Sequence, residues 1–223
     1  MRVAFLSDVH GNALALDACL AHVRSVGADA VYFLGDAVGY LPAAREVLDR
    51  LAAEGIPCQQ GNHERMLLTP AEVPPDRETA YRLGAARARL DDTHLERVAG
   101  WPVRRELTAG RRSFLLVHGS PAAPLDGYVY PDTDLAPFTD LPYDAVVMGH
   151  THRPFVRPSG GTVFVNAGSV GLPRDRGDSA AFALYDSEAD RFETVRVPLD
   201  VPAILSAYGD RIADAVRACL LRR

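Results

Sequence analysis

The sequence predicts an α/β protein in which two facing sheets lie inside layers of helices. In the first half of the chain, short apolar runs alternate with helical patterns, as in the βαβ units of a parallel sheet. In the second half, alternating apolar and polar residues flank short turns, which is typical of hairpins. The chain has 223 residues, 48% of them hydrophobic, and no recognisable linker. We therefore expect a single domain spanning residues 1–223.

The first half contains the alternation of strands and helices. Apolar runs predict buried strands at residues 3–6 and 30–34, and a short strand is expected at 56–59. Helical patterns follow the first two strands, at residues 13–25 and 43–53. Because parallel strands need crossover connections of this kind, the strands should pair in parallel.

The second half changes from helix-linked strands to hairpins. After a Pro-rich loop, residues 77–98 are expected to form one helix. Two hairpins are expected, one formed by residues 103–107 and 111–117 and the other by 180–186 and 191–197. Two further strands are expected at 145–148 and 162–165, and an amphipathic helix at 203–221 closes the chain. The closing helix should pack on a sheet.

Composition excludes several classes of protein. The net charge is −5, with acids and bases interspersed, so a face for duplex nucleic acid is not expected. No apolar stretch approaches the ~20 residues that span a bilayer, and the first apolar run is too short for a signal peptide. The three cysteines form no C-x-x-C pair, which favours a reducing, cytoplasmic setting. All 24 basic residues are arginine, which excludes lysine chemistry.

The first predicted strand ends in the sequence SDVHGN. Asp8 and His10 lie two residues apart, and residues at this spacing share one face of a strand. An oxygen ligand and a nitrogen ligand should therefore project together from the strand end. This geometry suits metal chelation, although the pair alone is a weak signal because Asp-x-His also arises by chance.

Polar clusters also follow four later apolar runs. They contain Asp36 after 31–34; Asn62, His63 and Glu64 after 56–59; His118 after 114–117; and His150 and His152 after 146–148. The ends of strands are where α/β folds place their sites. With His10, five of the seven histidines lie at predicted strand ends, whereas His22 and His94 fall inside predicted helices and are interpreted as surface or packing residues. The joint pattern predicts a metal site.

The predicted donors are too numerous for one ion. Two aspartates, an asparagine amide and several imidazoles fit two divalent ions about 3.5–4 Å apart, bridged by one carboxylate. Because thiolates are absent and the donors are mixed nitrogen and oxygen, manganese, iron and zinc all fit, and we expect manganese first. Such a pair stabilises an attacking hydroxide and holds phosphoryl oxygens. The site is therefore expected to hydrolyse esters of phosphorus.

The ordered set DVH, GD, GNHE, H and GHTH resembles that of the calcineurin-like metallophosphoesterase superfamily. The segment NAGSVGLPRD, residues 166–175, is similar to the NPGSVG segment of small bacterial, phosphodiesterase-like members of that superfamily. The resemblance covers most of the chain. It implies a four-layer α-β-β-α sandwich of two mixed sheets flanked by helices, with a di-metal site at the strand ends.

The resemblance also implies roles for the matching residues. The first metal would be held by Asp8, His10, Asp36 and His152, and the second by Asp36, Asn62, His118 and His150. His63 would contact phosphate and protonate the leaving oxygen, and Glu64 would orient His63. Asn12 would support the first ligand loop or touch the substrate, and Asn62 also stands among the expected substrate contacts.

Two departures from related families narrow the prediction. Phosphoprotein phosphatases also contain GNHE, but they place an arginine before it and carry a GDxVDRG sequence earlier. Here Gln60 precedes Gly61, and the earlier sequence reads GDAVGY. A Ser/Thr protein phosphatase is therefore not expected.

Substrate choice is expected to depend on the variable segments. Residues 65–100 could form a wall over the site. Tyr128 and Tyr130 could stack on a base or an aryl group, or could pack a long loop. Arg153 and Arg174 lie near motif residues and are expected to bind substrate.

The leading hypothesis is a di-metal-dependent phosphoesterase that acts on a small phosphodiester or nucleotide. A metal-bridging hydroxide would attack in line and His63 would act as the general acid. The alternatives are a dinucleoside polyphosphate hydrolase and a metal-binding scaffold without catalysis. The expected partner is the small substrate, with no duplex nucleic acid and no membrane.

Overall fold

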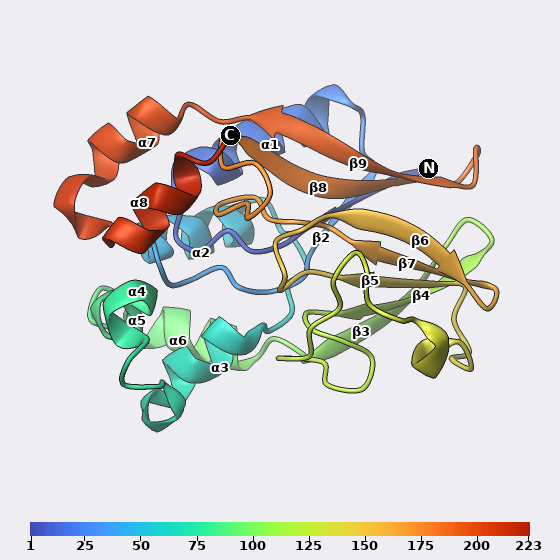
Figure 1. Cartoon of the computed structure of the whole chain (residues 1–223), viewed down its shortest axis with the longest axis horizontal. Helices are drawn as coiled ribbons and strands as arrows, with labels where there is room; N and C mark the ends of the chain where they lie inside the picture. The colour runs from blue at the N-terminus through green and yellow to red at the C-terminus, as the bar shows by residue number, and fades with distance from the viewer.

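Two sheets face each other, with helices packed around them, in the computed structural model, which describes all 223 residues (Figure 1). The first sheet has the strand order β2-β1-β8-β9. β1 pairs in parallel with β2 and antiparallel with β8. The strands of this sheet are β1 (Arg2–Leu6), β2 (Ala30–Phe33), β8 (Ser179–Asp186) and β9 (Arg191–Pro198).

The second sheet has the order β3-β4-β5-β7-β6. Its three central strands are parallel, and an antiparallel strand closes each edge. Its strands are β3 (Arg104–Ala109), β4 (Arg112–Val117), β5 (Ala145–Met148), β6 (Phe155–Ser159) and β7 (Thr162–Asn166). Both sheets are mixed and flanked by helices, which confirms the predicted fold class.

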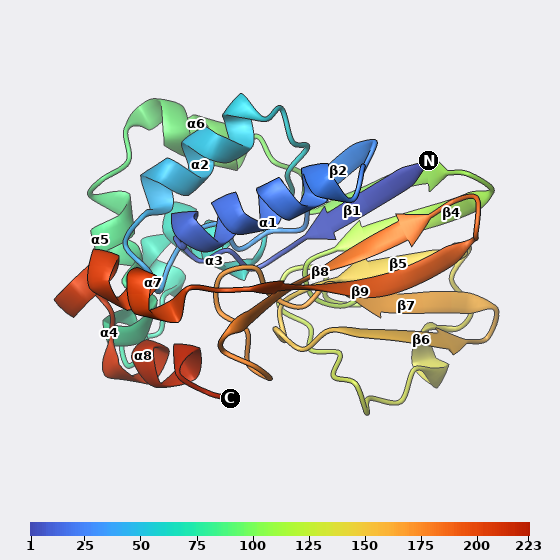
Figure 2. The ribbon, with the colours of Figure 1, turned by 90° about the horizontal axis from the view of Figure 1, so that it is seen from above.

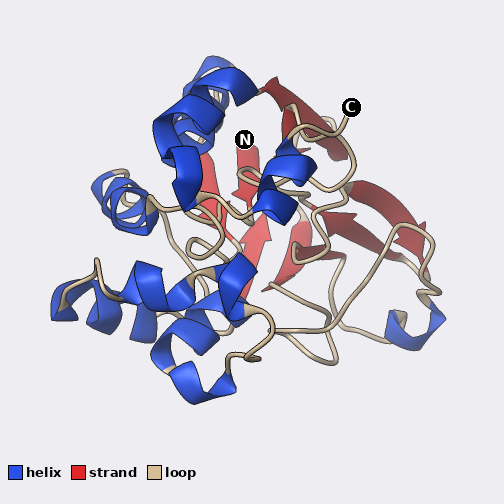
Figure 3. Cartoon of the chain, turned by 60° about the vertical axis from the view of Figure 1, so that its left-hand side comes forward, coloured by secondary structure: helices blue, strands red, loops and turns tan.

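Most of the helices lie toward one side of the molecule, and one short helix lies beyond the strands on the other side (Figure 3). In the view from above, α1 and α2 lie along the first sheet (Figure 2). The helices are α1 (Ala13–Ser25), α2 (Ala44–Ala53), α3 (Asn62–Leu68), α4 (Glu78–Tyr81), α5 (Leu83–Arg87), α6 (Asp92–Ala99), α7 (Val201–Tyr208) and α8 (Asp214–Leu220). None is long and apolar enough to cross a membrane.

Alternation along the strands divides the core into layers. In β1, Val3 and Phe5 face the second sheet, whereas Ala4 and Leu6 join the large cluster beneath the helices. In β4, Phe114 also packs between the sheets. The opposite face of β4 packs against residues of the long loop that follows it. This is the two-residue period of a strand that is buried on both faces.

Three predicted elements differ from the structure. The expected strand at 56–59 is only a single bridge between Phe33 and Cys58. The helix expected at 77–98 is three short helices, because Arg82 adopts a left-handed backbone (φ 53°) and Asp91 caps a new helix. The closing helix breaks at Gly209 (φ 53°, ψ −133°), a conformation that glycine alone adopts readily. The sequence pattern also missed β6 and α3.

Candidate metal centre

Asp8 and His10 lie in the loop after β1 and not in the strand itself. Both have a left-handed backbone, with φ of 57° and 51°, so the two-residue strand period is the wrong reason for expecting them together. They still meet, with His10 Nε2 3.6 Å from Asp8 Oδ1. The backbone N–H of Asp8 donates to Gly35, and that of His10 donates to Asp36. These bonds join the loops that follow β1 and β2.

Left-handed backbone is concentrated at the predicted ligands. Eight non-glycine residues have positive φ, and five of them are expected ligands: Asp8, His10, Asp36, His150 and His152. Each such residue costs roughly 1–3 kcal/mol, and such strain tends to accumulate at functional sites. The loops therefore hold their side chains in conformations that local sequence preference alone would not favour.

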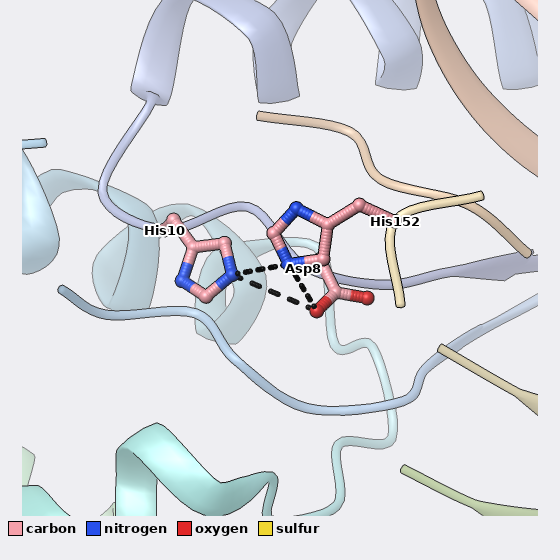
Figure 4. Close-up of side chains that lie close together, drawn as sticks. All are labelled: Asp8, His10 and His152. Carbon is pink, nitrogen blue, oxygen red and sulfur yellow. Dashed lines mark hydrogen bonds and ion pairs between the residues drawn. The ribbon is translucent and has the colours of Figure 1, made fainter. Parts of the chain in front are cut away.

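The first group of donors consists of Asp8, His10 and His152, whose ring nitrogens and carboxylate point toward one another (Figure 4). His10 Nε2 lies 3.0 Å from His152 Nε2. His152 Nε2 lies 3.2 Å from Asp8 Oδ1. All three side chains are buried.

The second group consists of Asp36, His118 and His150. His118 Nε2 lies 3.3 Å from Asp36 Oδ2, and the same oxygen is 3.7 Å from His10 Nε2 of the first group. Asp36 therefore lies between the two groups. A third possible set joins His10 and Asp36 to His63, the residue expected to act as an acid.

Backbone carbonyls orient the imidazole rings. His10 Nδ1 lies 3.1 Å from the carbonyl of Val38, and His118 Nδ1 lies 3.0 Å from that of Leu34. His152 Nδ1 lies 2.5 Å from the carbonyl of Leu172. Because a carbonyl only accepts, each Nδ1 carries a proton and each Nε2 points into the centre, where a neutral ring presents a lone pair. Lone pairs facing each other at 3.0 Å repel unless a cation lies between them.

Four of the expected metal-binding atoms are buried and have no hydrogen-bond partner. They are Asp8 Oδ1, Asn62 Oδ1, His118 Nε2 and His150 Nε2. An unpaired buried polar atom costs about 1–3 kcal/mol, so four in one place require an explanation. Nitrogen and oxygen donors without a thiolate suit a divalent cation such as manganese, iron or zinc. The residues present therefore fit a metal.

The charges of the centre favour the same conclusion. Burial would raise the pKa of Asp8, but the imidazoles of His152 and His118 outweigh it and hold that pKa well below its usual value. The pKa of Asp36 is lowered in the same way, mainly by His118 and His63. Burial lowers the pKa of His150 to about 4. Asp36 and Asp8 outweigh the effect of burial on His118 and raise the pKa of that residue to about 9. The carboxylates of the centre therefore hold positive charge beside them, and a metal ion bound at His118 would take the place of a proton.

Glu64 supports the site differently from the expectation. Its carboxylate accepts three backbone N–H bonds, from Asp36 (2.7 Å), Ala37 (2.8 Å) and Gly61 (2.8 Å). No hydrogen bond joins it to the ring of His63. Glu64 therefore holds the Asp36 loop against the start of α3, and it orients His63 only through the backbone.

His63 lies among aromatic rings at the first turn of α3. Its ring centroid is 5.0 Å from that of Tyr40 and 4.7 Å from that of Tyr81. Its backbone N–H donates to Asp36 Oδ1 at 2.9 Å. Burial lowers its pKa to about 3. An anion placed beside the ring would favour its charged form.

Asn12 cannot contact substrate as it stands. The side chain is fully buried; its oxygen accepts from Ala15 at the start of α1, and its nitrogen donates to Gly171. Both polar atoms are therefore used within the fold. The structure therefore supports the expected role of Asn12 in holding the first ligand loop and contradicts the expected contact with substrate.

A small cavity opens over the centre. It is lined by Asp36, Tyr40, Asn62, His63, Tyr81, Tyr128, His150, His152 and Arg174. Arg174 donates to the hydroxyl of Tyr40 at 3.3 Å. Arg153 is exposed and does not line this cavity, so its position does not support the expected substrate contact. The sequence pattern missed Tyr40 and Tyr81, although Tyr40 follows Asp36 closely in GDAVGY.

The fold and the site together define an α/β protein with an aspartate- and histidine-rich metal centre at one end of two facing sheets. The chain belongs to the calcineurin-like phosphoesterase superfamily, whose domain model matches residues 1–190. It is a metallophosphoesterase and hence a hydrolase. The predicted resemblance and enzyme class are confirmed.

Relatives of this chain cover nearly its whole length. It is 26% identical to an uncharacterized protein of Methanocaldococcus jannaschii over 218 residues, 89% of this chain and 88% of the relative. It is 24% identical to the phosphodiesterase YfcE of Escherichia coli over 192 residues, 84% of this chain and 89% of that one.

Solved structures share the fold. The crystal structure of a metallophosphoesterase from Sphaerobacter thermophilus matches with a TM-score of 0.81 at 26% identity, covering 99% of this chain and 98% of that one. A hypothetical protein from Pyrococcus horikoshii matches with a TM-score of 0.83 at 22% identity, covering 98% and 97%.

Proposed function

We propose that the protein is a di-metal-dependent phosphoesterase that hydrolyses a small phosphodiester or nucleotide. The observation that carries this proposal is the convergence of unpaired, buried donor atoms on both sides of Asp36. The named activity of the relative YfcE supports a diester substrate. We propose manganese as the first metal to test, with iron and zinc as alternatives.

The two groups of donors correspond to two proposed metal positions. Asp8, His10, Asp36 and His152 would hold one ion, and Asp36, Asn62, His118 and His150 the other. When bound, two divalent ions supply the positive charge that activates water and neutralises phosphoryl oxygens. The free thiols of the three cysteines are consistent with the proposed cytoplasmic setting.

Residues around the centre would position the ester. Arg174 lies at the cavity and can pair with a phosphoryl oxygen. His63 Nδ1 lies close to the backbone of Gly39. A Cβ atom added to Gly39 would be only 2.4 Å from this nitrogen. The other ring nitrogen, Nε2, is therefore the one available to the substrate. We propose that it donates a proton to the leaving oxygen.

The experiment that tests this function is hydrolysis of bis-p-nitrophenyl phosphate by metal-stripped protein, with and without Mn²⁺, Fe²⁺ or Zn²⁺. The expected result is turnover only after metal is added. If the protein binds metal at the centre yet releases no p-nitrophenolate with any of the three ions, it is not a phosphodiesterase of this kind. A scaffold function would then be favoured.

A further inference from the structure

The cavity over the metal centre is too small for a whole substrate. Its free volume is about 20 Å³. A space of roughly 10–15 Å³ on this measure holds one water molecule. The organic group of a phosphoester therefore has no room inside and must lie outside, against the rim.

Two tyrosines form an aromatic shelf at this rim. The shelf consists of Tyr128 and Tyr130, whose rings are 5.8 Å apart and nearly parallel, with 9° between their planes. Tyr128 also lines the cavity, and its ring centroid is 4.2 Å from that of His150. His150, Tyr128 and Tyr130 therefore form a row of neighbouring rings that begins at the cavity.

The shelf does not serve to pack the loop that carries it. Val129, between the two tyrosines, is 1% exposed and joins the cluster on the outer face of the second sheet. Tyr128 and Tyr130 are 54% and 39% exposed. Val129 thus anchors the loop, and the two rings are left with large surfaces open to solvent.

We propose that the aromatic shelf binds a planar aromatic group of the substrate, which would be a nucleobase or an aryl ring, by stacking on Tyr128. This inference rests on the proposed function, because it assumes that the phosphoryl group occupies the cavity beside Arg174. Arg174 would hold the anionic part while the ring lies on the shelf. The favoured substrates are therefore phosphoesters of nucleosides or aryl alcohols, and small alkyl esters should bind weakly.

Calorimetry on the full-length, Mn²⁺-loaded protein tests the shelf directly. The ligands are thymidine 5′-phosphate, phenyl phosphate and methyl phosphate, which share the phosphate and differ in the organic group. Tyr128→Ala should weaken binding of an aromatic ligand about 5- to 100-fold, the range measured for single stacked bases, and change methyl phosphate by less than about twofold. Tyr128→Phe keeps the ring and should bind like the wild type, and Tyr130→Ala should show a smaller loss.

The outcomes separate the shelf from the proposed function. A loss confined to thymidine 5′-phosphate identifies a nucleobase, and a loss for both aromatic ligands identifies any planar ring. The inference is wrong if the wild type does not prefer aromatic ligands, or if Tyr128→Ala weakens methyl phosphate equally. Metal-dependent turnover of bis-p-nitrophenyl phosphate reports on the proposed function separately, so either can fail alone.

Discussion

At the scale of single residues, the centre is a set of side chains whose direction is fixed by backbone groups. Carbonyl groups hold Nδ1 of His10, His118 and His152, so that each Nε2 faces the centre. The carboxylate of Glu64 in turn is held by three N–H groups. Because these partners belong to the main chain, the geometry depends on the loop conformations rather than on other side chains.

Replacing His63 by alanine separates its two possible roles. If His63 is the general acid, His63→Ala should bind metal normally and lose about 10²–10⁴-fold in kcat, the usual worth of such a group. Metal analysis and turnover of bis-p-nitrophenyl phosphate are the measurements. The control is His22→Ala, which replaces a half-buried histidine on α1. A loss of bound metal in His63→Ala would instead make this residue a ligand, in the group with His10 and Asp36.

Asp36 should matter to both proposed metal positions, because its Oδ2 lies between the two groups. Asp36→Asn preserves size and tolerates the positive φ of this position. We expect bound metal to fall from about two ions per chain toward one, and turnover to fall by more than about 100-fold, the upper end for partners outside the ligand sphere. Mass spectrometry under native conditions counts the ions. Full occupancy in Asp36→Asn would contradict the bridging role.

At the scale of elements, the site is made by loops that approach one another closely at the ends of strands. Gly61, at the start of α3, faces the Asp36 loop, and Gly149, after β5, faces Ser7 and Asp8. A side chain at either position would collide with a ligand or its loop. Glycine beside the clusters is therefore a requirement of the close approach between neighbouring loops.

Gly61→Ala tests this close approach without a backbone penalty, because the φ of Gly61 is −103°. The added Cβ would lie 2.2 Å from Asp36 Oδ1, so the Asp36 loop must move. We expect a loss of about 1–3 kcal/mol in the free energy of unfolding and reduced metal binding. Gly100→Ala, whose nearest contact would be 3.5 Å, should change stability by less than about 0.5 kcal/mol. Equal behaviour of the two variants in urea unfolding would argue against the close approach.

At the scale of the whole molecule, the two sheets must keep their relative position for the loops to meet. Asp190, in the turn between β8 and β9, accepts hydrogen bonds from Arg111, Arg112 and Tyr185. Arg112 is the first residue of β4 in the other sheet, so the Asp190 carboxylate joins the two sheets. This contact lies at the turn of the β8–β9 hairpin, at the opposite end from the connection between β9 and α7. Hydrogen bonds, first from Arg112 and then from Arg111, hold the pKa of Asp190 well below its usual value.

Asp190→Asn should lower stability, and the size of the effect should depend on pH. A carboxyl whose pKa is depressed by folding stabilises the protein fully above its unfolded pKa, which is about 3.9. This stabilisation is lost as the pH falls through the lower, folded pKa. The urea midpoints of wild type and variant should therefore differ at pH 7 and converge on acidification below about pH 4. Glu188→Gln, which removes a charge from an exposed position two residues away, should leave the midpoint nearly unchanged at both pH values.

Much of the fold was predictable because strands and helices obey local periodicity. The strand at residues 145–148 and the helix at 13–25 were predicted with their observed bounds, and both hairpins were found. The predicted helices that proved wrong are interrupted by local backbone conformations, which the periodicity of apolar residues does not reveal. Apolar positions continue in register through Arg82 and Gly209, yet left-handed backbone breaks both helices there.

The sequence by itself determined which donor atoms the protein carries and in what order, because residue type and spacing along the chain define that pattern. Only the tertiary structure decided how they meet. His10 and His152 are separated by 142 positions, yet their nitrogens are 3.0 Å apart. The tertiary packing also directs the side chains of Asn12 and Glu64 to hydrogen bonds with backbone groups. It brings Tyr40 and Tyr81 to the cavity, and it places Arg174 there but not Arg153. These outcomes depend on contacts between distant loops, whose approach no local sequence preference encodes.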